Sequence, residues 1–296
     1  MTTAVRTPVE KAPKRLGMSP WLLLAPSTVL LVLLFGWPLV QGVLAAFQGE
    51  GGAFTLANWE RLFGDPYFTE ALLNTLLLIV IVVPIQLVLA VGMTLLIQSK
   101  PRFGGLHFYI WAIPLAISDL AAGLVWLTVF ADRGYLNSLL IGLGLSENGI
   151  AWLNYDNPTT MLLAVVVAEI WRATSMVFVI VVAGVQMMPP DYDEAAQVFG
   201  ASAWQRLRYV TLPLLKPSLQ VALILRTILA LQAFAVAQAL TGRNFPLLVG
   251  ETYQWYVNLQ NPAVASAVAL VILALSLGTA ILYMRALRQP SAGGPR

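Results

Sequence analysis

Four ionisable side chains lie inside long apolar stretches of the sequence, where an unpaired charge is costly. The four are Asp119, Glu169, Arg172 and Arg226. Charged residues inside membrane spans usually face the interior of a helix bundle and pair with one another. Glu169 and Arg172 are three residues apart, so on a helix they share one face and can pair directly. We interpret the four charges first as ion pairs that fix helix packing, and second as direct contacts for a solute.

A second candidate site combines two amides and an aromatic ring in one apolar stretch. Gln232, Phe234 and Gln238 follow one another at spacings of two and four. Gln238 lies one helical turn beyond Phe234, so an amide and a ring can share a face. Sugar sites combine amide hydrogen bonds with aromatic faces, and a few polar groups on an apolar wall suit a binding cavity. Hydrogen bonds between helices by the glutamines, with Phe234 packed against lipid, explain the pattern equally well.

The sequence offers no set of residues for covalent, metal or nucleotide chemistry. It contains no cysteine and a single histidine, His107, and one histidine does not make a zinc site. It also lacks a phosphate-binding loop of the form Gly-x-x-x-x-Gly-Lys-Ser/Thr. No nucleophile is paired with a base, which argues against an enzyme embedded in the membrane. We therefore expect no catalytic residues, no metal and no cofactor bound by this chain.

The composition indicates that the helices that carry these residues lie in a membrane. Of the 296 residues, 58% are hydrophobic and 10% are charged, whereas a soluble domain carries about 25% charged residues. The apolar runs are continuous and can hold helices of about 20 residues, which argues against the strands of a barrel. We predict an all-α integral membrane protein with six transmembrane helices. The predicted spans cover residues 20–46, 70–98, 106–131, 159–185, 217–240 and 263–285.

The basic residues predict the orientation of these spans. Most of them fall on the side of the two chain ends, and only Arg61, Arg133 and Arg243 fall on the other side. Because Lys and Arg concentrate in cytoplasmic loops, we expect both termini in the cytoplasm. The net charge of +3 reflects this orientation, so we expect no nucleic-acid partner. The predicted parts are a cytoplasmic tail at 1–19, a transmembrane domain at 20–285 and a cytoplasmic tail at 286–296.

The longest cytoplasmic connection, residues 186–216, is predicted to be structured. Two prolines end the fourth span, and Asp191 with Glu194 three residues later has the spacing of a helix-capping pair. Gly200 permits a sharp change of direction. A second short helix follows and ends at Leu212-Pro213. We expect a two-helix elbow that another protein can approach closely.

The elbow resembles the EAA loop of permease subunits in bacterial ATP-binding-cassette (ABC) importers. The matching residues are Glu194-Ala195-Ala196, Gly200-Ala201-Ser202 and Val210-Thr211-Leu212-Pro213. In that family the loop sits in a cleft of the cytoplasmic ATPase. The resemblance implies an ATPase-coupling site that consists of Glu194, Ala195, Ala196, Gly200, Leu212 and Pro213. Phe199 departs from the family pattern, because many members have Asp before the glycine.

The resemblance extends over nearly the whole chain and is closest to the sugar permeases of the maltose and glycerol-phosphate type. It is carried by Leu24-Ala25-Pro26, Asp65-Pro66-Tyr67-Phe68, Asn74-Thr75, Ile113-Pro114, Gly134-Tyr135-Leu136-Asn137, Glu169-Ile170-Trp171-Arg172 and Trp204-Gln205-Arg206. After Leu240-Thr241-Gly242, however, Arg243-Asn244-Phe245 replaces the glycines of a family turn.

This resemblance implies a multi-pass subunit of the bacterial cytoplasmic membrane that takes up a sugar or a related small polar solute. The implied partners are a second, different permease, an extracytoplasmic solute-binding protein and two cytoplasmic ATPase subunits that bind ATP and magnesium. The remaining contacts are with membrane lipid. The uncharged stretch from Thr227 to Gly242 favours a neutral solute, such as a disaccharide or polyol, over a phosphorylated one.

A transporter driven by an ion gradient is the alternative. Such transporters commonly show two similar halves and broken spans at matching positions. The sequence shows no internal repeat, and Pro84 and Pro114 have no counterparts in the second half.

Overall fold

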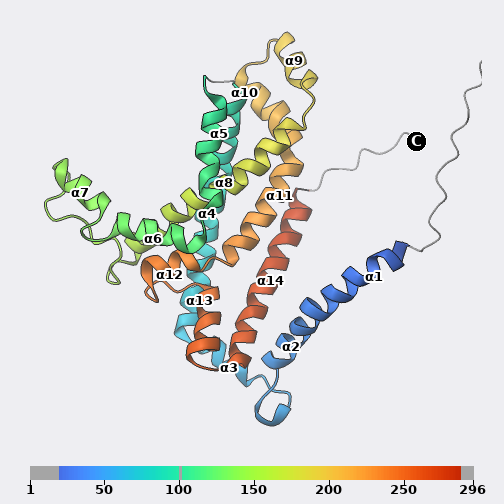
Figure 1. Cartoon of the computed structure of the whole chain (residues 1–296), viewed down its shortest axis with the longest axis vertical. Coiled ribbons are helices and arrows are strands. Elements are labelled where there is room, and N and C mark those ends of the chain that lie inside the picture. The colour runs from blue at the N-terminus through green and yellow to red at the C-terminus, as the bar shows by residue number, and fades with distance from the viewer. Residues whose placement is uncertain (1–19, 100–101, 288–296) are drawn as a thin grey trace, which may run out of the picture. The chain divides into compact units, whose positions relative to one another are not determined.

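The computed structural model describes residues 20–99 and 102–287 (Figure 1). Within these residues every regular element is helical, and a single isolated β-bridge joins Gln48 to Phe54. The predicted all-α class is therefore confirmed. The chain divides into two compact units, residues 1–44 and 45–296, which we describe separately. The predicted tail at 1–19, most of the tail at 286–296 and the basic residue Lys100 lie outside the described residues.

The first candidate span contains a short π-helical turn between two α-helical segments. Its elements are α1 (Pro20–Leu31), η1 (Val32–Gly36) and α2 (Trp37–Ala46). In the π-turn the N–H of Trp37 donates to the carbonyl of Val32, five residues earlier. Pro38 follows directly and has no N–H to donate, so a local widening of the helix accommodates it. The apolar run from Leu23 to Ala46 is long enough to cross a membrane, as predicted.

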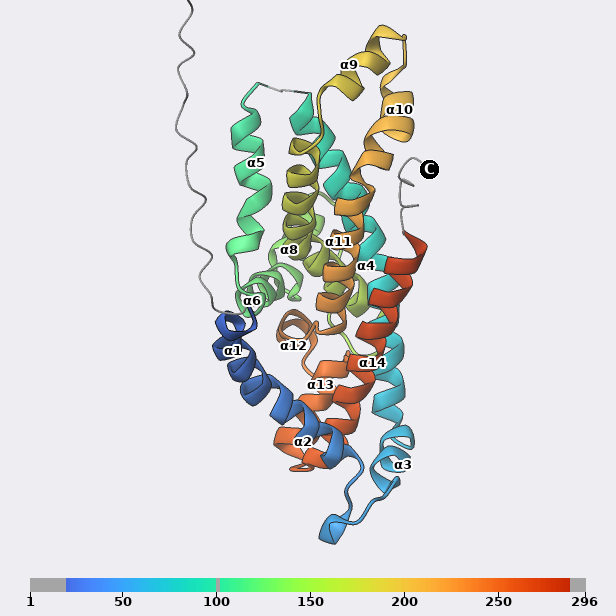
Figure 2. The same cartoon turned by 90° about the vertical axis from the view of Figure 1, so that its right-hand side faces the viewer.

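Four long helices run beside one another in the second unit (Figures 1 and 2). They are α4 (Pro66–Gln98), α8 (Pro158–Gln186), α11 (Leu212–Leu231) and α14 (Pro262–Ala286). Three of them begin in the same way, because a proline at the first position follows a side chain that caps the helix. The capping side chains of Asp65, Asn157 and Asn261 accept hydrogen bonds from the backbone N–H groups of Tyr67, Thr160 and Val264.

The third predicted span, 106–131, is not a continuous helix. Its elements are α5 (Gly104–Ala112), η3 (Ile113–Ala116), α6 (Asp119–Phe130) and α7 (Tyr135–Gly142). The helix axis bends by 103° between residues 116 and 119. Ser118 has an extended backbone, and its hydroxyl accepts a hydrogen bond from the N–H of Ala121, so a new helix starts there. Within residues 20–99 and 102–287, five helices are long and apolar enough to cross a membrane, or six if this bent pair is one span.

The fifth predicted span, 217–240, is wrong at both ends. A single helical rod runs from Ala203 to Leu231 through α10 (Ala203–Arg206), η4 (Leu207–Thr211) and α11. Leu212-Pro213 therefore does not end the second helix of the elbow. The π-turn η4 precedes Pro213. Its wider hydrogen-bond spacing lets the helix continue although the proline has no N–H to donate. At the other end Phe234 has non-helical backbone angles (φ −147°, ψ −62°) and separates α11 from α12 (Ala235–Thr241).

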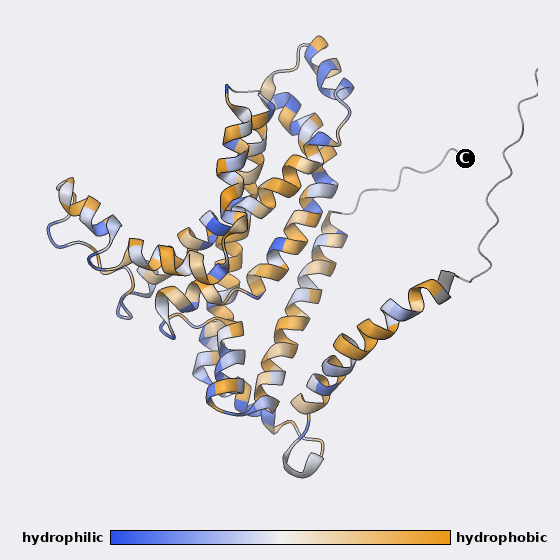
Figure 3. Cartoon of the chain, in the orientation of Figure 1, coloured by the Kyte–Doolittle hydropathy of each residue, from blue (hydrophilic) through white to orange (hydrophobic). Residues whose placement is uncertain are grey.

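Short elements lie at the two ends of the long helices (Figure 2). Helices α9 (Asp191–Val198) and α10 lie at one end, and α3 (Ala57–Phe63) and α13 (Leu248–Tyr253) lie at the other. The π-turn η5 (Gln254–Asn258) follows α13, and η2 (Glu50–Gly52) precedes α3. Apolar residues dominate the long helices, and polar residues gather toward the short elements (Figure 3). This distribution fits helices that cross an apolar layer.

Small residues allow the helices of the second unit to approach closely. Gly184 on α8 faces Ser218 on α11, and a Cβ atom at Gly184 would stand 2.6 Å from the Cβ of Ser218. Gly123 on α6 faces α12, where an added Cβ would stand 2.7 Å from that of Ala239. Helix packing in membranes depends on van der Waals contact between such small residues.

We predict that Gly184→Ala destabilises the protein, because the added methyl group overlaps Ser218 and forces α8 and α11 apart. Overpacking of this kind costs about 1–3 kcal/mol. Gly92→Ala on α4 is the matched control, since no atom lies within 4 Å of a Cβ added there. Thermal unfolding in detergent measures both variants. Equal melting temperatures for the two variants would contradict the packing described.

Candidate functional site

Arg226 lies at the centre of a buried polar cluster between α4, α8 and α11. Its side chain is 1% exposed, and its Nη2 atom lies 2.9 Å from Oε2 of Glu169, which is 2% exposed. Its Nε atom donates to Oε1 of Gln86, which is fully buried. The amide of Gln86 in turn donates to the backbone carbonyl of Glu169 over 2.8 Å. Three helices are therefore joined by one arginine and its two acceptors.

Arg172 extends this cluster to α6. Its Nη1 atom lies 2.7 Å from Oδ1 of Asp119, and its Nη2 atom lies 3.5 Å from Oε2 of Glu169. Asp119 is the exposed end of the cluster, with a side chain that is 52% exposed. All four charges that the sequence singled out therefore lie in one network, with two acids and two bases. The predicted pair of Glu169 and Arg172 is present, and each also has a stronger partner.

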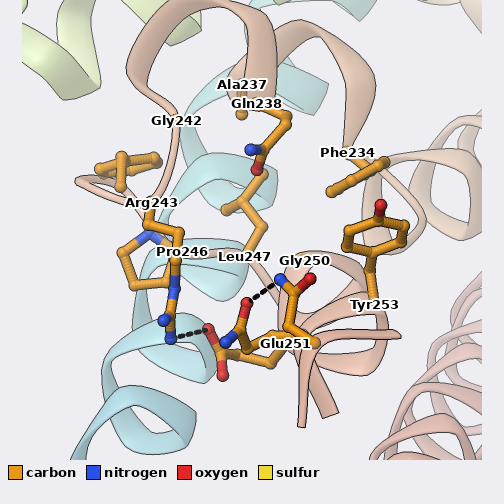
Figure 4. A pocket seen from close by; sticks show the side chains of 13 residues that line it. Phe234, Ala237, Gln238, Gly242, Arg243, Pro246, Leu247, Gly250, Glu251 and Tyr253 are labelled. Atoms are coloured by element: carbon orange, nitrogen blue, oxygen red, sulfur yellow. Dashed lines mark hydrogen bonds and ion pairs between the residues drawn. The ribbon is translucent and has the colours of Figure 1, made fainter. Parts of the chain in front are cut away.

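Phe234 and Gln238 line a pocket of about 60 Å³ (Figure 4). The pocket lies between α12, the turn after it, α13 and η5. Gln238 is one turn beyond Phe234, and its N–H donates to the carbonyl of Phe234 over 2.8 Å, as the predicted shared face requires. Gln232 does not line this pocket; it is exposed and directly follows the last residue of α11. The break between α11 and α12 separates Gln232 from the other two residues.

An aromatic pair and an ion pair stand on different sides of the pocket (Figure 4). The ring centroids of Phe234 and Tyr253 are 5.6 Å apart. Nη2 of Arg243 lies 3.9 Å from Oε1 of Glu251. The amide side chains of Gln254 and Asn258 complete the polar part of the lining. Aromatic rings, amides and a charged pair together provide the groups that bind a polar, ring-shaped molecule.

The turn that leads into the pocket depends on a glycine. Gly242 has φ +60° and ψ −125°, a combination that residues with a side chain rarely adopt. The chain reverses there, so that Arg243 reaches back to α13. The guanidinium of Arg243 also stacks on the ring of Tyr67, 5.0 Å from its centroid. The sequence Arg243-Asn244-Phe245, which departs from the family turn, thus supplies one wall of the pocket.

Glu251 is buried at this wall, and only 3% of its side chain is exposed. Burial raises the pKa of Glu251 above its ordinary value of 4.5, because it disfavours the ionised form. The charge of Arg243 opposes this rise in pKa, and the neighbouring acids Asp65 and Glu70 add to it.

The sequence interpretation missed the five lining residues with polar or charged side chains other than Gln238, which are Arg243, Glu251, Tyr253, Gln254 and Asn258. Arg243 enters the sequence analysis only as a loop charge and as part of the altered family turn. An indication was nevertheless present, since the segment after the fifth span is rich in amides and aromatic residues and follows an altered family turn.

The elbow consists of α9 and α10, joined at Gly200. Gly200 has φ +77°, as the predicted sharp change of direction requires. The predicted cap at Asp191 is wrong, because Pro190 occupies the cap position and no side chain caps α9. A capping box is present instead at α10, where Ser202 and Gln205 exchange hydrogen bonds between side chains and backbone. Serine in an extended conformation is a better cap than a residue that follows two prolines.

An ion pair fixes α9 against α10. Nη1 of Arg206 lies 3.2 Å from Oδ2 of Asp193, which also accepts a hydrogen bond from Gln197 over 2.8 Å. The motif residues Glu194, Ala195, Ala196 and Gly200 lie on the first helix and at the bend. Leu212 and Pro213 lie elsewhere, in the first turn of α11. Two apolar side chains beside Gly200, Val198 and Phe199, are 84% and 89% exposed.

Comparison with known proteins places this arrangement in a family. The family model described as the inner membrane component of binding-protein-dependent transport systems matches residues 68–288, which include the charged cluster, the pocket and the elbow. The chain belongs to this family. It is therefore a multi-pass inner-membrane permease of an ABC importer, and the ion-gradient alternative is set aside.

Two relatives and one solved structure illustrate the match. The chain is 35% identical to the sulfoquinovosyl glycerol transport system permease protein SmoG of Agrobacterium fabrum, over 90% of this chain and 89% of that protein. It is 31% identical to the trehalose/maltose transport system permease protein MalF of Thermococcus litoralis, over 78% of each. A chain of a bacterial ABC transporter that imports the acidic polysaccharide alginate has the same fold, with a TM-score of 0.75 at 20% identity over 92% of this permease and 96% of that chain.

We predict that Glu169→Gln strongly destabilises the permease, because it leaves the buried charge of Arg226 uncompensated. Loss of one partner from a buried ion pair costs about 3–5 kcal/mol. Asp119→Asn is the matched control at the exposed end of the same cluster, where an ion pair contributes about 1 kcal/mol or less. Melting temperatures of the two variants in detergent provide the measurement. A smaller loss for Glu169→Gln than for Asp119→Asn would contradict the central place of Arg226.

A second prediction concerns pH. The folded-state pKa of Glu251 lies above its unfolded value, so the wild-type protein gains stability as pH falls through the folded-state pKa. We expect Glu251→Gln to remove this dependence, with its largest stabilising effect at neutral pH and a smaller effect at pH values near the unfolded pKa. Thermal unfolding across pH tests this, with Glu147→Gln in an exposed loop as control. If the stabilising effect of Glu251→Gln instead grew as the pH fell, the predicted direction of the Glu251 pKa shift would be wrong.

Proposed function

We propose that this permease forms, with a second and different permease subunit, the membrane path of a sugar importer. The relatives SmoG and MalF are both described as permeases for sugar-containing solutes, and their similarity extends over most of the chain. The groups in the pocket fit such a solute, since Phe234 and Tyr253 offer rings and Gln238, Gln254 and Asn258 offer amides. Energy comes from ATP and magnesium on two separate ATPase subunits, and an extracytoplasmic binding protein delivers the solute.

The elbow is the docking site for the ATPase in this proposal. Glu194 and Ala195 are exposed on α9, and no side chain of that helix is buried within the described residues. The exposed Val198 and Phe199 give the same helix an apolar end at the bend. A short helix that contacts its own chain mainly through one ion pair is available to another protein. This observation, together with the EAA-type motif, carries the proposal.

The continuous rod from Ala203 to Leu231 provides the mechanical connection. The ion pair of Asp193 and Arg206 holds α9 against the start of this rod. Arg226 anchors the rod near its far end, and the break at Phe234 follows two turns later, beside the pocket. A movement of α9 that follows ATP binding is then transmitted along the rod to the point at which the pocket begins.

The distribution of charges in the second unit supports a cytoplasmic location for the elbow. Arg206, Arg208 and Lys216 lie at the elbow end of the second unit. Asp65 and Glu251 lie at the opposite end, beside α3 and α13. Basic residues concentrate on the cytoplasmic side of membrane proteins, so α9 and α10 face the compartment that contains ATP.

The proposal predicts that the ATPase subunits copurify with the intact permease and not with a Glu194→Arg, Gly200→Trp variant. The first change reverses the charge of the exposed α9 face, and the second places a bulky side chain at a bend where φ is +77°. The quantity of ATPase retained per permease in detergent is the measurement. Glu147→Arg is the matched control, because it reverses an exposed charge in the loop after α7.

Retention of the ATPase by the control and its loss from the double variant would support the elbow as the coupling site. The double variant must also melt at the same temperature as the wild type, so that unfolding does not explain the loss. Equal retention by wild type and double variant would refute this docking site.

A further inference from the structure

The pocket beside the break in the fifth span carries charged groups that a site for a purely apolar molecule does not need. Glu251 is almost fully buried, yet its carboxylate lines the pocket, and Arg243 is 51% exposed beside it. A second hollow of about 410 Å³ shares Arg243, Glu251 and Gln254 with the first and continues toward Tyr67. A solute that enters either space therefore meets the same ion pair.

The positive charge of Arg243 already has partners within the protein. Arg243 pairs with Glu251 and stacks on Tyr67, so its charge is balanced before any solute arrives. Among the other charged groups, Arg61 and Asp65 line the larger hollow. Two basic groups, Arg61 and Arg243, thus face two acidic ones, Asp65 and Glu251. The lining has no excess of positive charge that could balance an anionic solute.

A neutral, hydroxyl-rich solute meets a complementary surface in the same place. The carboxylate of Glu251 accepts hydrogen bonds from hydroxyl groups, and the guanidinium of Arg243 and the amides of Gln238 and Gln254 donate hydrogen bonds to hydroxyl oxygens. The ring of Phe234, packed against Tyr253, offers an apolar face to the C–H side of a sugar ring. Hydroxyl groups use both partners of the ion pair, whereas a carboxylate or sulfonate can use only one.

We infer that the pocket lined by Phe234, Gln238, Arg243 and Glu251 selects a neutral, hydroxyl-rich solute against an anionic one, and that Glu251 is the residue that sets this selection. The inference rests on the proposed function, since it assumes that the pocket lies on the solute path. It distinguishes this permease from two of the proteins compared above by the charge of the solute. SmoG is described as a permease for a sulfoquinovosyl compound, and the structural neighbour imports an acidic polysaccharide.

Saturation-transfer NMR on the complete importer in lipid nanodiscs tests this inference, because it detects weak binding of a small sugar. The probes are trehalose, which is neutral, and a disaccharide of two mannuronic acids, which carries two carboxylates. We expect the wild-type importer to transfer saturation to trehalose and to leave the acidic disaccharide at the level of empty nanodiscs. Because the lining has no excess of positive charge to compensate the loss of hydration of two carboxylates, the ratio of the two signals should exceed about tenfold.

The variant Glu251→Gln preserves the shape of the side chain and removes its charge. We expect it to raise the signal of the acidic disaccharide about fivefold or more, because Arg243 loses its partner and becomes available to an anion. Glu147→Gln in the exposed loop after α7 should leave both signals unchanged. Arg243→Gln should weaken the trehalose signal and leave the acidic disaccharide undetected.

Three outcomes would overturn the inference. They are a wild-type signal from the acidic disaccharide equal to that of trehalose, an unchanged ratio in Glu251→Gln, and no signal from either sugar above empty nanodiscs. Association with the ATPase is read from copurification, which depends on the elbow at the other end of the molecule. A failure of the pocket inference is therefore distinguishable from a failure of the proposed coupling.

Discussion

The buried ion pair of Arg226 with Glu169 is the constraint on which the arrangement of the second unit depends. A guanidinium placed between three apolar helices requires an acceptor in the same space, and Glu169 and Gln86 supply acceptors from α8 and α4. The positions of these helices are therefore fixed relative to α11 by polar geometry as well as by packing. Ion pairs of this kind do not guarantee stability, but breaking one is expensive. The close contact of Gly184 with Ser218 reinforces the same pair of helices.

The fixed position of α11 explains why its two ends can have different roles. Beyond Arg226 the helix continues to Leu231 and then breaks, which leaves room for the pocket between α12 and α13. In the opposite direction the rod extends without interruption through the π-turn η4 to the elbow. Under the proposed function, this rod transmits a displacement of the elbow over its length to the pocket.

Much of this architecture was predictable from the sequence. Hydropathy located the apolar stretches that hold the long helices, and the EAA-type motif marked the connection that contains α9 and α10, because both signals are local. Starts of helices were also readable from Asp65-Pro66, Asn157-Pro158 and Asn261-Pro262, in which a capping side chain precedes a proline. The absence of charge between Glu70 and Lys100 had instead set the start of α4 at residue 70, four residues late.

Other features were not predictable, because they depend on contacts between residues far apart in the chain. The break at Phe234 contains neither proline nor glycine, so no local signal marks it. Leu212-Pro213 predicts a helix end, but the π-turn η4 allows the helix to continue. Glu251 enters the pocket only because the turn at Gly242 reverses the chain, and a loop charge in the sequence gives no indication of that burial.

The central claim is that the helix from the elbow to the break moves as one body, and that the break is the point of flexion. Because the chain contains no native cysteine, spin labels can be placed on cysteines introduced at Arg208, Leu229 and Asn258. Distances between pairs of these spin labels in the complete importer, measured by double electron–electron resonance with and without ATP, would test the claim. The distance from 208 to 229 spans 21 residues of helix, about 32 Å, and should not change with ATP. The distance from 208 to 258 crosses the break and should change. A change in the first distance, or no change in the second, would contradict this account.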